Sequence, residues 1–243
     1  MNDAEKKDEL SEMTRDVTTN YIKWKNEPTI KEGISFAEHY KREVINTFNK
    51  VDLDSIARVS LLLYETKERG NQIFLFGNGG SHSIASHIAC DLGKSTKIPG
   101  IKEQKPYKTH SLDNPSWVTA LTNDGEASFI EGKYSGTYQH GYDGAFVGQL
   151  ENFLNKGDVA FGISSSGNSN NIVNALMYAK ENGAHTVAMV GFDGGKAAKI
   201  ADHVILVPTE KGKYGIVEGL HGDIHHLMVE FAINLEKSRY KKL

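Results

Sequence analysis

The sequence lacks the features that mark secreted, membrane-spanning or nucleic-acid-binding proteins. Its 243 residues include one cysteine, which cannot form a disulfide within the chain and favours a cytoplasmic location. No apolar run approaches the roughly 20 residues of a membrane helix, and the charged start, MNDAEKKDELSEM, holds no apolar core of a secretory signal. The formal net charge is −3 without a long basic block, so we expect neither a nucleic-acid nor a membrane partner.

The common nucleotide-binding motifs are missing too. The chain has no Walker lysine motif and no GxGxxG turn, which disfavours nucleoside triphosphates and dinucleotides as ligands. Hydrophobic residues make up 39% and charged residues 24%, as in an ordinary globular protein. The length fits one large α/β domain, alone or with a helical extension.

The first third of the chain is predicted to be helical. One helix is expected from Asp3 to about Asn26, before the break at Pro28, and a second from about Ser35 to Asn49. Asp52 or Asp54 is a suitable cap for a third helix. These helices carry apolar stripes that a small α/β core does not cover in full. We therefore expect them to associate between subunits.

Short apolar runs then alternate with helical patterns as far as Pro208. Five runs are predicted to be buried parallel strands: QIFLFG, WVTALTND, DVAFGISSSG, HTVAMVG and DHVILVP. The helical segment NNIVNALMYAKENGA ends at Gly183, and a last helix is expected from about Ile216 to Lys237. The segment KSTKIPGIKEQKPYKTHSLDN, 94–114, is predicted to be a long loop.

This alternation predicts an α/β fold with a doubly wound, flavodoxin-like parallel sheet flanked by helices. Residues 1–51 are expected to form an N-terminal helical extension that packs on the core and at subunit interfaces. Residues 52–243 are expected to form the α/β domain.

Two loops at the carboxyl ends of predicted strands are unusual. GNGGSHS, 77–83, brings Ser81 close to a helix N-terminus, where free N–H groups favour an anion. A turn with a capping serine explains this loop equally well. GISSSGNSNN, 162–171, offers four hydroxyl groups between a strand and a helix. Binding of the phosphate of a small metabolite explains these hydroxyl groups better than helix capping alone does.

Together with NDG and the late segment EGLHGDIHHLMVEF, these loops resemble the sugar isomerase (SIS) domain, and more narrowly the phosphoheptose isomerases. The resemblance covers about Asp52 to Lys237. It implies an aldose–ketose isomerase that converts sedoheptulose 7-phosphate to D-glycero-D-manno-heptose 7-phosphate through an enediolate. It also implies a cytoplasmic homotetramer with sites near subunit interfaces. The implied phosphate and substrate contacts are Asn78, Gly79, Ser81, Asp124, Ser164, Ser165, Ser166 and Ser169.

His87 and Asp91 are four positions apart, so both lie on one face of the expected helix. The resemblance implies that a zinc ion is bound by His87, Asp91, Glu218 and His226. The chain departs from the family pattern with Asp91 in place of a glutamate and Glu218 in place of a glutamine. Both residues keep oxygen ligands that zinc accepts.

The proton-transfer roles also come from the resemblance. It implies that Asp91 acts as the base, with His226 or Glu218 as its partner in the proton exchange. Because Asp91 is one methylene shorter than the family's glutamate, it is either the base or only a metal ligand. His221 and His225 are expected to be hydrogen-bonded core residues.

Two other functions are consistent with the sequence. Some SIS proteins bind phosphosugars or protein partners without catalysis, and the expected metal ligands argue against that alternative. The other alternative is an isomerase or epimerase of a different phosphosugar, which the exchanges at Asp91 and Glu218 leave open.

Overall fold

The computed structural model describes residues 29–123 and 141–240 and divides the chain into two compact units, 1–45 and 46–243. Helix α2 (Ile30–Phe48) makes up most of what is described of the first unit. Its start is a capping box: Thr29 Oγ1 accepts from the Glu32 amide, and the Glu32 carboxylate accepts from the Thr29 amide. The helix expected from Asp3 to Asn26 lies outside the described residues.

Helix α3 (Leu53–Arg69) opens the second unit. Asp52 is its N-cap, and Oδ1 of Asp52 accepts from the Asp54 amide at 3.0 Å. The helix ends at Gly70, which has a φ of 81° and so takes a left-handed conformation open to glycine without strain. The sequence placed this helix start correctly, and Asp52 rather than Asp54 is the cap.

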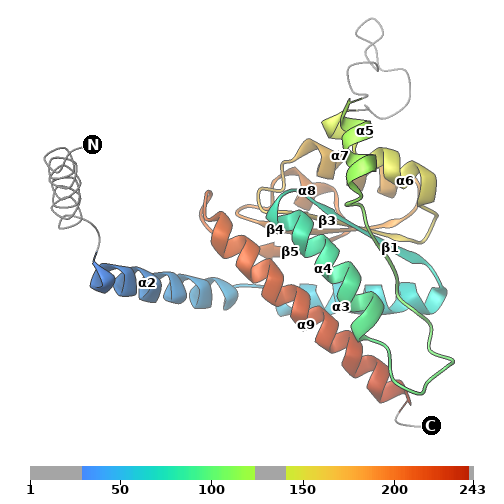
Figure 1. Ribbon diagram of the computed structural model, residues 1–243, viewed down its shortest axis with the longest axis horizontal. Coiled ribbons are helices and arrows are strands. Elements are labelled where there is room, and N and C mark those ends of the chain that lie inside the picture. Colours follow the sequence, from blue (N-terminus) through green and yellow to red (C-terminus); the bar gives the residue numbers. More distant parts are fainter. Residues whose placement is uncertain (1–28, 124–140, 241–243) are drawn as a thin grey trace, which may run out of the picture. The chain divides into compact units, whose positions relative to one another are not determined.

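The second unit is built on a five-stranded parallel sheet with the order β2-β1-β3-β4-β5 (Figure 1). The strands are β1 (Gln72–Gly77), β2 (Lys108–Ser111), β3 (Val159–Ser164), β4 (His185–Gly191) and β5 (His203–Val207). This is the predicted doubly wound, flavodoxin-like fold. The chain direction across the sheet reverses between β1 and β3, where such folds place their ligands.

Two segments differ from the prediction. The described part of the predicted strand WVTALTND, WVTALTN, belongs to a helix, α5 (Pro115–Asn123), and Asn114 Oδ1 accepts from the Ser116 amide at its start. Proline at the first helical position is the signal that outweighs the apolar run, because periodicity alone does not separate a short helix from a strand. The fifth strand is instead β2, inside the segment predicted to be a loop. Its sequence, KTHS, carries no buried apolar pattern, since it forms an edge strand.

Helices cover both faces of the sheet. Helices α3, α4 (Gly80–Ser95) and α9 (Tyr214–Tyr240) pack on one face, where α4 and α9 run side by side (Figure 1). The other face is covered by α6 (Val147–Phe153), α7 (Asn170–Glu181), α8 (Gly195–Ile200) and the short 3-10 helix η2 (Tyr142–Gly144). An apolar core between these helices and the sheet includes Phe74, Phe76, Leu150, Ile172 and Leu176.

A buried ion pair ties α3 to α9. The Lys67 ammonium and the Glu236 carboxylate are both fully buried and in contact. Gln104 Nε2 donates to the second oxygen of Glu236 at 2.9 Å, so both carboxylate oxygens have partners. None of the helices in residues 29–123 and 141–240 combines the length and apolar character needed to cross a bilayer.

Candidate functional site

A small pocket lies where β1 and β3 end, at the point of reversal in the sheet. Its volume is about 190 Å³. We call it the serine pocket, and its lining residues are Asn78, Ser81, Ile163, Ser164, Ser165, Ser166, Ser169, Tyr214 and Glu218. The two loops singled out in the sequence therefore meet in one cavity.

The serine hydroxyls differ in how they are used. Ser164 Oγ accepts from the Gly167 amide at 3.1 Å, which folds the loop back on itself. Ser165 Oγ is buried and has no hydrogen-bond partner within the described part of the chain. A buried hydroxyl in that condition carries a desolvation cost that a ligand oxygen would remove. The pocket thus offers a donor to an oxygen-rich group.

The loop conformation is enforced by close packing. Gly167 has a φ of 62°, and a Cβ added there would lie 2.0 Å from the carbonyl oxygen of Gly194. Ser169 is the N-cap of α7, yet its side chain makes no capping hydrogen bond and instead lines the pocket. The free amides at the start of α7 add to the positive potential on this side.

The glycine loop is fixed to α7 by an amide pair. Asn78 Nδ2 donates to Asn171 Oδ1 at 3.0 Å, and Asn171 Nδ2 donates back to Asn78 Oδ1 at 2.9 Å. Gly79, with a φ of 55°, is the N-cap of α4, and Ser81 is buried in the first turn. The two sides of the pocket are therefore held at a fixed separation.

Glu218 is the one charged side chain among the described residues that line the pocket. A Cβ added at Gly80 would lie 2.4 Å from Glu218 Oε2, so glycine at this position makes room for the carboxylate. The carboxylate packs against the first turn of α4, where the helix dipole stabilises a negative charge.

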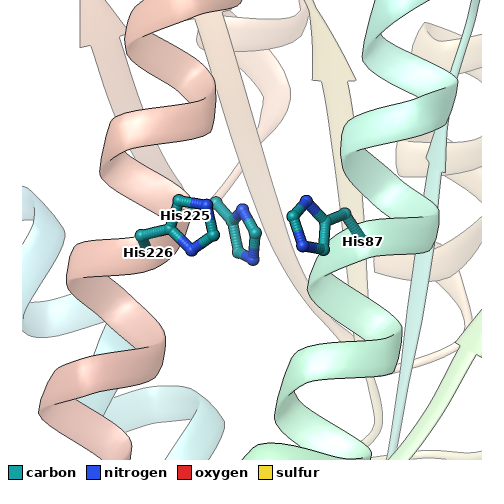
Figure 2. Close-up of side chains that lie close together, drawn as sticks. All are labelled: His87, His225 and His226. Carbon is teal, nitrogen blue, oxygen red and sulfur yellow. The ribbon is translucent and has the colours of Figure 1, made fainter.

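A second polar centre lies further along α9. Figure 2 shows His87 of α4 facing His225 and His226 of α9. One ring nitrogen from each of these three histidines lies within 4.8 Å of the others. We call this group the histidine cluster. His225 is buried, whereas His87 and His226 are exposed.

Asp91 joins all three members of the histidine cluster. Its Oδ2 atom lies 3.0 Å from His225 Nε2, 3.2 Å from His87 Nε2 and 3.9 Å from His226 Nδ1. Burial, followed by the neighbouring His226 and His87, lowers the pKa of His225 to about 4, although Asp91 opposes the shift. A neutral imidazole at pH 7 keeps the lone pair that a metal ion needs.

The cluster has the dimensions of a metal site. Tetrahedral zinc with donors at about 2.0–2.1 Å places those donors about 3.3 Å apart. The separations of 3.0, 3.2 and 3.9 Å around Asp91 Oδ2 bracket that value. Imidazole and carboxylate are also the donor types that zinc accepts, so the residues present fit the ion.

Comparisons with known proteins identify the family of the chain. The SIS domain family model matches residues 38–191. The phosphoheptose isomerase of Sulfurimonas denitrificans is 35% identical over 183 residues, which cover 74% of this chain and 83% of that protein. The chain belongs to the phosphoheptose isomerase family of SIS domain proteins.

Solved structures of two family members share the fold. The phosphoheptose isomerase of Neisseria gonorrhoeae superposes with a TM-score of 0.69 at 24% identity, covering 84% of this chain and 98% of its own. The phosphoheptose isomerase of Francisella tularensis also gives a TM-score of 0.69, at 22% identity, covering 85% of this chain and 100% of its own.

The structure divides the residues that the family resemblance named into two groups. Asn78, Ser81, Ser164, Ser165, Ser166, Ser169 and Glu218 line the serine pocket, and His87, Asp91 and His226 lie together at the histidine cluster. Asp124 lies outside the described residues.

The sequence did not single out His225 as part of the site, or Tyr214 as a lining residue. The adjacent pair His225-His226 on the last helix was the available signal for His225.

Proposed function

We propose that this protein is a phosphoheptose isomerase, which converts sedoheptulose 7-phosphate to D-glycero-D-manno-heptose 7-phosphate. The observation that carries the proposal is that helix α9 contributes side chains both to the serine pocket and to the histidine cluster. The chain is also 35% identical to a phosphoheptose isomerase. The first centre suits a phosphate, and the second suits the carbonyl end of a sugar.

The spacing of the two centres matches the length of such a substrate. Glu218 and His225 are seven positions apart on α9, which corresponds to about 10.5 Å along the helix axis. In an extended seven-carbon ketose 7-phosphate, the carbonyl carbon and the phosphorus are about 9 Å apart, given carbon–carbon bonds of about 1.5 Å. An open-chain substrate therefore reaches from the serine pocket to the histidine cluster.

The phosphate is assigned to the serine loop and the start of α7. Ser164, Ser165, Ser166 and Ser169 supply hydroxyl groups, and the helix amides supply further donors. Asn78, Gly79 and Ser81 form the facing wall, and we assign Asp124 to the substrate site as well. The unpartnered hydroxyl of Ser165 is the strongest support for an oxygen ligand here.

The isomerisation moves one proton between neighbouring carbons and another between their oxygens. We assign Asp91 as the base that takes the proton from C1 of the ketose and returns it to C2 after an enediolate has formed. The second proton moves from the C1 hydroxyl to the C2 oxygen, and we assign this transfer to His226, because Glu218, the other candidate that the resemblance named, lies in the serine pocket at the phosphate end. Aldose and ketose then differ only in where these two protons lie.

The proposed metal is zinc. His87, Asp91 and His226 would hold it, and we assign His225 as the fourth donor in preference to Glu218, since Glu218 lines the serine pocket. A bound dication would stabilise negative charge on the substrate oxygens as the enediolate forms.

We also propose a homotetramer, formed through the N-terminal helices. Helix α2 exposes large apolar side chains, namely Ile30, Ile34, Phe36, Tyr40 and Ile45. Such a surface is unusual for a monomer and typical of an interface between subunits. Light scattering on the purified protein tests this assembly, and a monomer would contradict it.

Turnover of the sugar phosphate tests the function directly. The zinc-loaded protein should convert sedoheptulose 7-phosphate to the aldose and should exchange the C1 proton with solvent deuterium, both of which NMR detects. Fructose 6-phosphate serves as the shorter comparison substrate. Binding of the phosphosugar without exchange or conversion would instead favour a non-catalytic SIS protein, and preferred conversion of the hexose would favour another phosphosugar isomerase.

A further inference from the structure

A strained residue lies beside the serine pocket. Phe192, with a φ of 55°, is the one residue other than glycine that takes a positive φ within the described part of the chain. A bulky side chain rarely adopts this conformation, and strain of this kind gathers at functional sites. The side chain is only 7% exposed, so it is held by its surroundings.

The ring of Phe192 holds one wall of the pocket. It packs edge to face against Tyr214, with ring centroids 5.0 Å apart and an interplanar angle of 87°. Tyr214 is the first residue of α9 and the one aromatic side chain among the described residues that line the serine pocket. Tyr214 is half-exposed, so part of its ring stays available to a ligand.

The elements on either side of Phe192, the end of β4 and the start of α8, also fix the serine loop. The Gly191 amide donates to the Ser165 carbonyl at 3.0 Å, and the Ala197 amide donates to the Gly167 carbonyl at 2.8 Å. The segment from the end of β4 to the start of α8 therefore sets the position of the hydroxyl groups and of the tyrosine ring together. This arrangement fixes the size of the space between them.

Tyr214 lies at the end of the site that is remote from the histidine cluster. Along α9 the order is Tyr214, Glu218, His225, and all three residues face the two polar centres. Tyr214 and Glu218 are four positions apart and so share one helix face. A phosphate in the serine pocket thus lies between the tyrosine ring and the carbon chain that leads to the cluster.

We propose that Tyr214 is the end wall of the phosphosugar site and sets the length of sugar phosphate that fits, with Phe192 as its positioning residue. The identity of the sugar rests on the proposed function. A longer chain would push its phosphate against the ring or draw its carbonyl end out of register with the cluster. One methylene changes selectivity by about 10- to 200-fold in a hydrophobic pocket, and the extra CHOH unit of a longer sugar lengthens the chain by the same one carbon.

Alditol phosphates test this without turnover, because they have no carbonyl group to isomerise. Calorimetry on the full-length protein compares heptitol 7-phosphate with octitol 8-phosphate. In the wild type, the octitol should bind at least about 10-fold more weakly than the heptitol. Tyr214→Ala should reduce that ratio to about 3 or less, and Tyr214→Phe should keep it, since the ring rather than the hydroxyl forms the wall.

The positioning role of Phe192 has its own readout. Phe192→Ala should lower the selectivity ratio as Tyr214→Ala does, and the double variant should show no further loss, because both changes remove the same wall. Phe192→Leu, which keeps an apolar side chain at the site, serves if the alanine variant does not fold. Phe153→Ala is the matched control, since Phe153 forms a similar aromatic pair with Trp117 outside the serine pocket.

Three results would overturn the inference: no selectivity in the wild type, an unchanged ratio in Tyr214→Ala, or a Phe192 effect that adds fully to that of Tyr214→Ala. A wild-type protein that selects heptitol 7-phosphate but does not turn over sedoheptulose 7-phosphate would contradict the proposed function and still support Tyr214 as the end wall. The two failures are therefore distinguishable.

Discussion

Asp91 and His225 meet across the contact of α4 with α9, with 3.0 Å between Oδ2 of the aspartate and Nε2 of the histidine. The two residues are 134 positions apart in the sequence, so the pair exists only in the folded chain. His225 is buried, and the same carboxylate oxygen lies 3.2 Å from His87. The buried His225 therefore anchors the histidine cluster. The exposed His87 and His226 are positioned by Asp91 and His225, so that a bound ligand is not the only group that orders them.

His225→Leu should weaken zinc binding. Loss of the imidazole removes a proposed ligand, and the affinity should fall by at least the roughly 10- to 100-fold that is lost when only an orienting partner of a ligand is removed. Competition with a chromophoric chelator measures the affinity. His39→Ala, on the exposed surface of α2, is the matched control and should bind zinc like the wild type. Equal affinities in the two variants would exclude His225 from the site.

Asp91→Asn should abolish most of the activity. The amide has no basic oxygen to take the C1 proton, and loss of a general base costs about 10²- to 10⁴-fold in rate. Asp91→Glu keeps a carboxylate, and we expect it to keep kcat within about tenfold. Exchange of the C1 proton with solvent deuterium measures the step directly. Full exchange in Asp91→Asn, with zinc still bound, would leave Asp91 a ligand only.

The central strands could be predicted from the sequence because their apolar runs are buried on both faces. Every residue of β3 is buried, for example, and the run VAFGIS shows it. The edge strand β2 was missed because KTHS pairs with one neighbour only and alternates between exposed and half-buried positions. Edge strands obtain their structure from the sheet rather than from their own composition.

The site was predicted in part for a similar reason. Residues that are close in the sequence can be predicted from local motifs, and the serine loop and the pair His87–Asp91 were predicted in this way. Whether a residue of α9 faces the pocket or the histidine cluster depends on how α9 crosses α4, which no local pattern encodes. Glu218 accordingly lines the serine pocket. His225 lies in the core, as expected, but its ring also contacts Asp91.

Glu218→Gln should strengthen phosphate binding. The carboxylate is the one charge among the described residues that line the serine pocket, and it repels a phosphate dianion across a short distance. Removal of that charge at constant shape should lower the Kd of inorganic phosphate by about 3- to 10-fold, and less in high salt. Calorimetry at two ionic strengths measures the change. An unchanged Kd would place the phosphate elsewhere.

Lys67→Met should destabilise the fold strongly. The variant leaves the buried Glu236 carboxylate without its cation, which costs about 3–5 kcal/mol in comparable pairs. The double variant Lys67→Met/Glu236→Leu should recover most of that loss, because no buried charge remains unpaired. Urea unfolding measures all three proteins. A double variant as unstable as the single one would show that packing around Gln104, rather than the charge, dominates.

His221 should make stability depend on pH. Its ring is fully buried on α9, and burial lowers its pKa to about 4, against the weaker opposing effect of the Val190 carbonyl. In the unfolded chain the pKa is near 6.5, so between these values the unfolded chain binds more protons than the folded one. The contribution of His221 is therefore complete above pH 6.5 and is lost as the pH falls toward 4.

Between pH 7.5 and pH 5, this shift corresponds to about 2 kcal/mol of unfolding free energy. His221→Leu, of similar volume, has no titrating ring and should lose about that much less than the wild type over the same interval. Urea unfolding in the presence of a chelator measures the difference without a metal contribution, and His39→Ala should behave like the wild type. Leucine does not titrate. If His221→Leu lost as much stability between pH 7.5 and pH 5 as the wild type, a group other than His221 would therefore be responsible for the acid sensitivity.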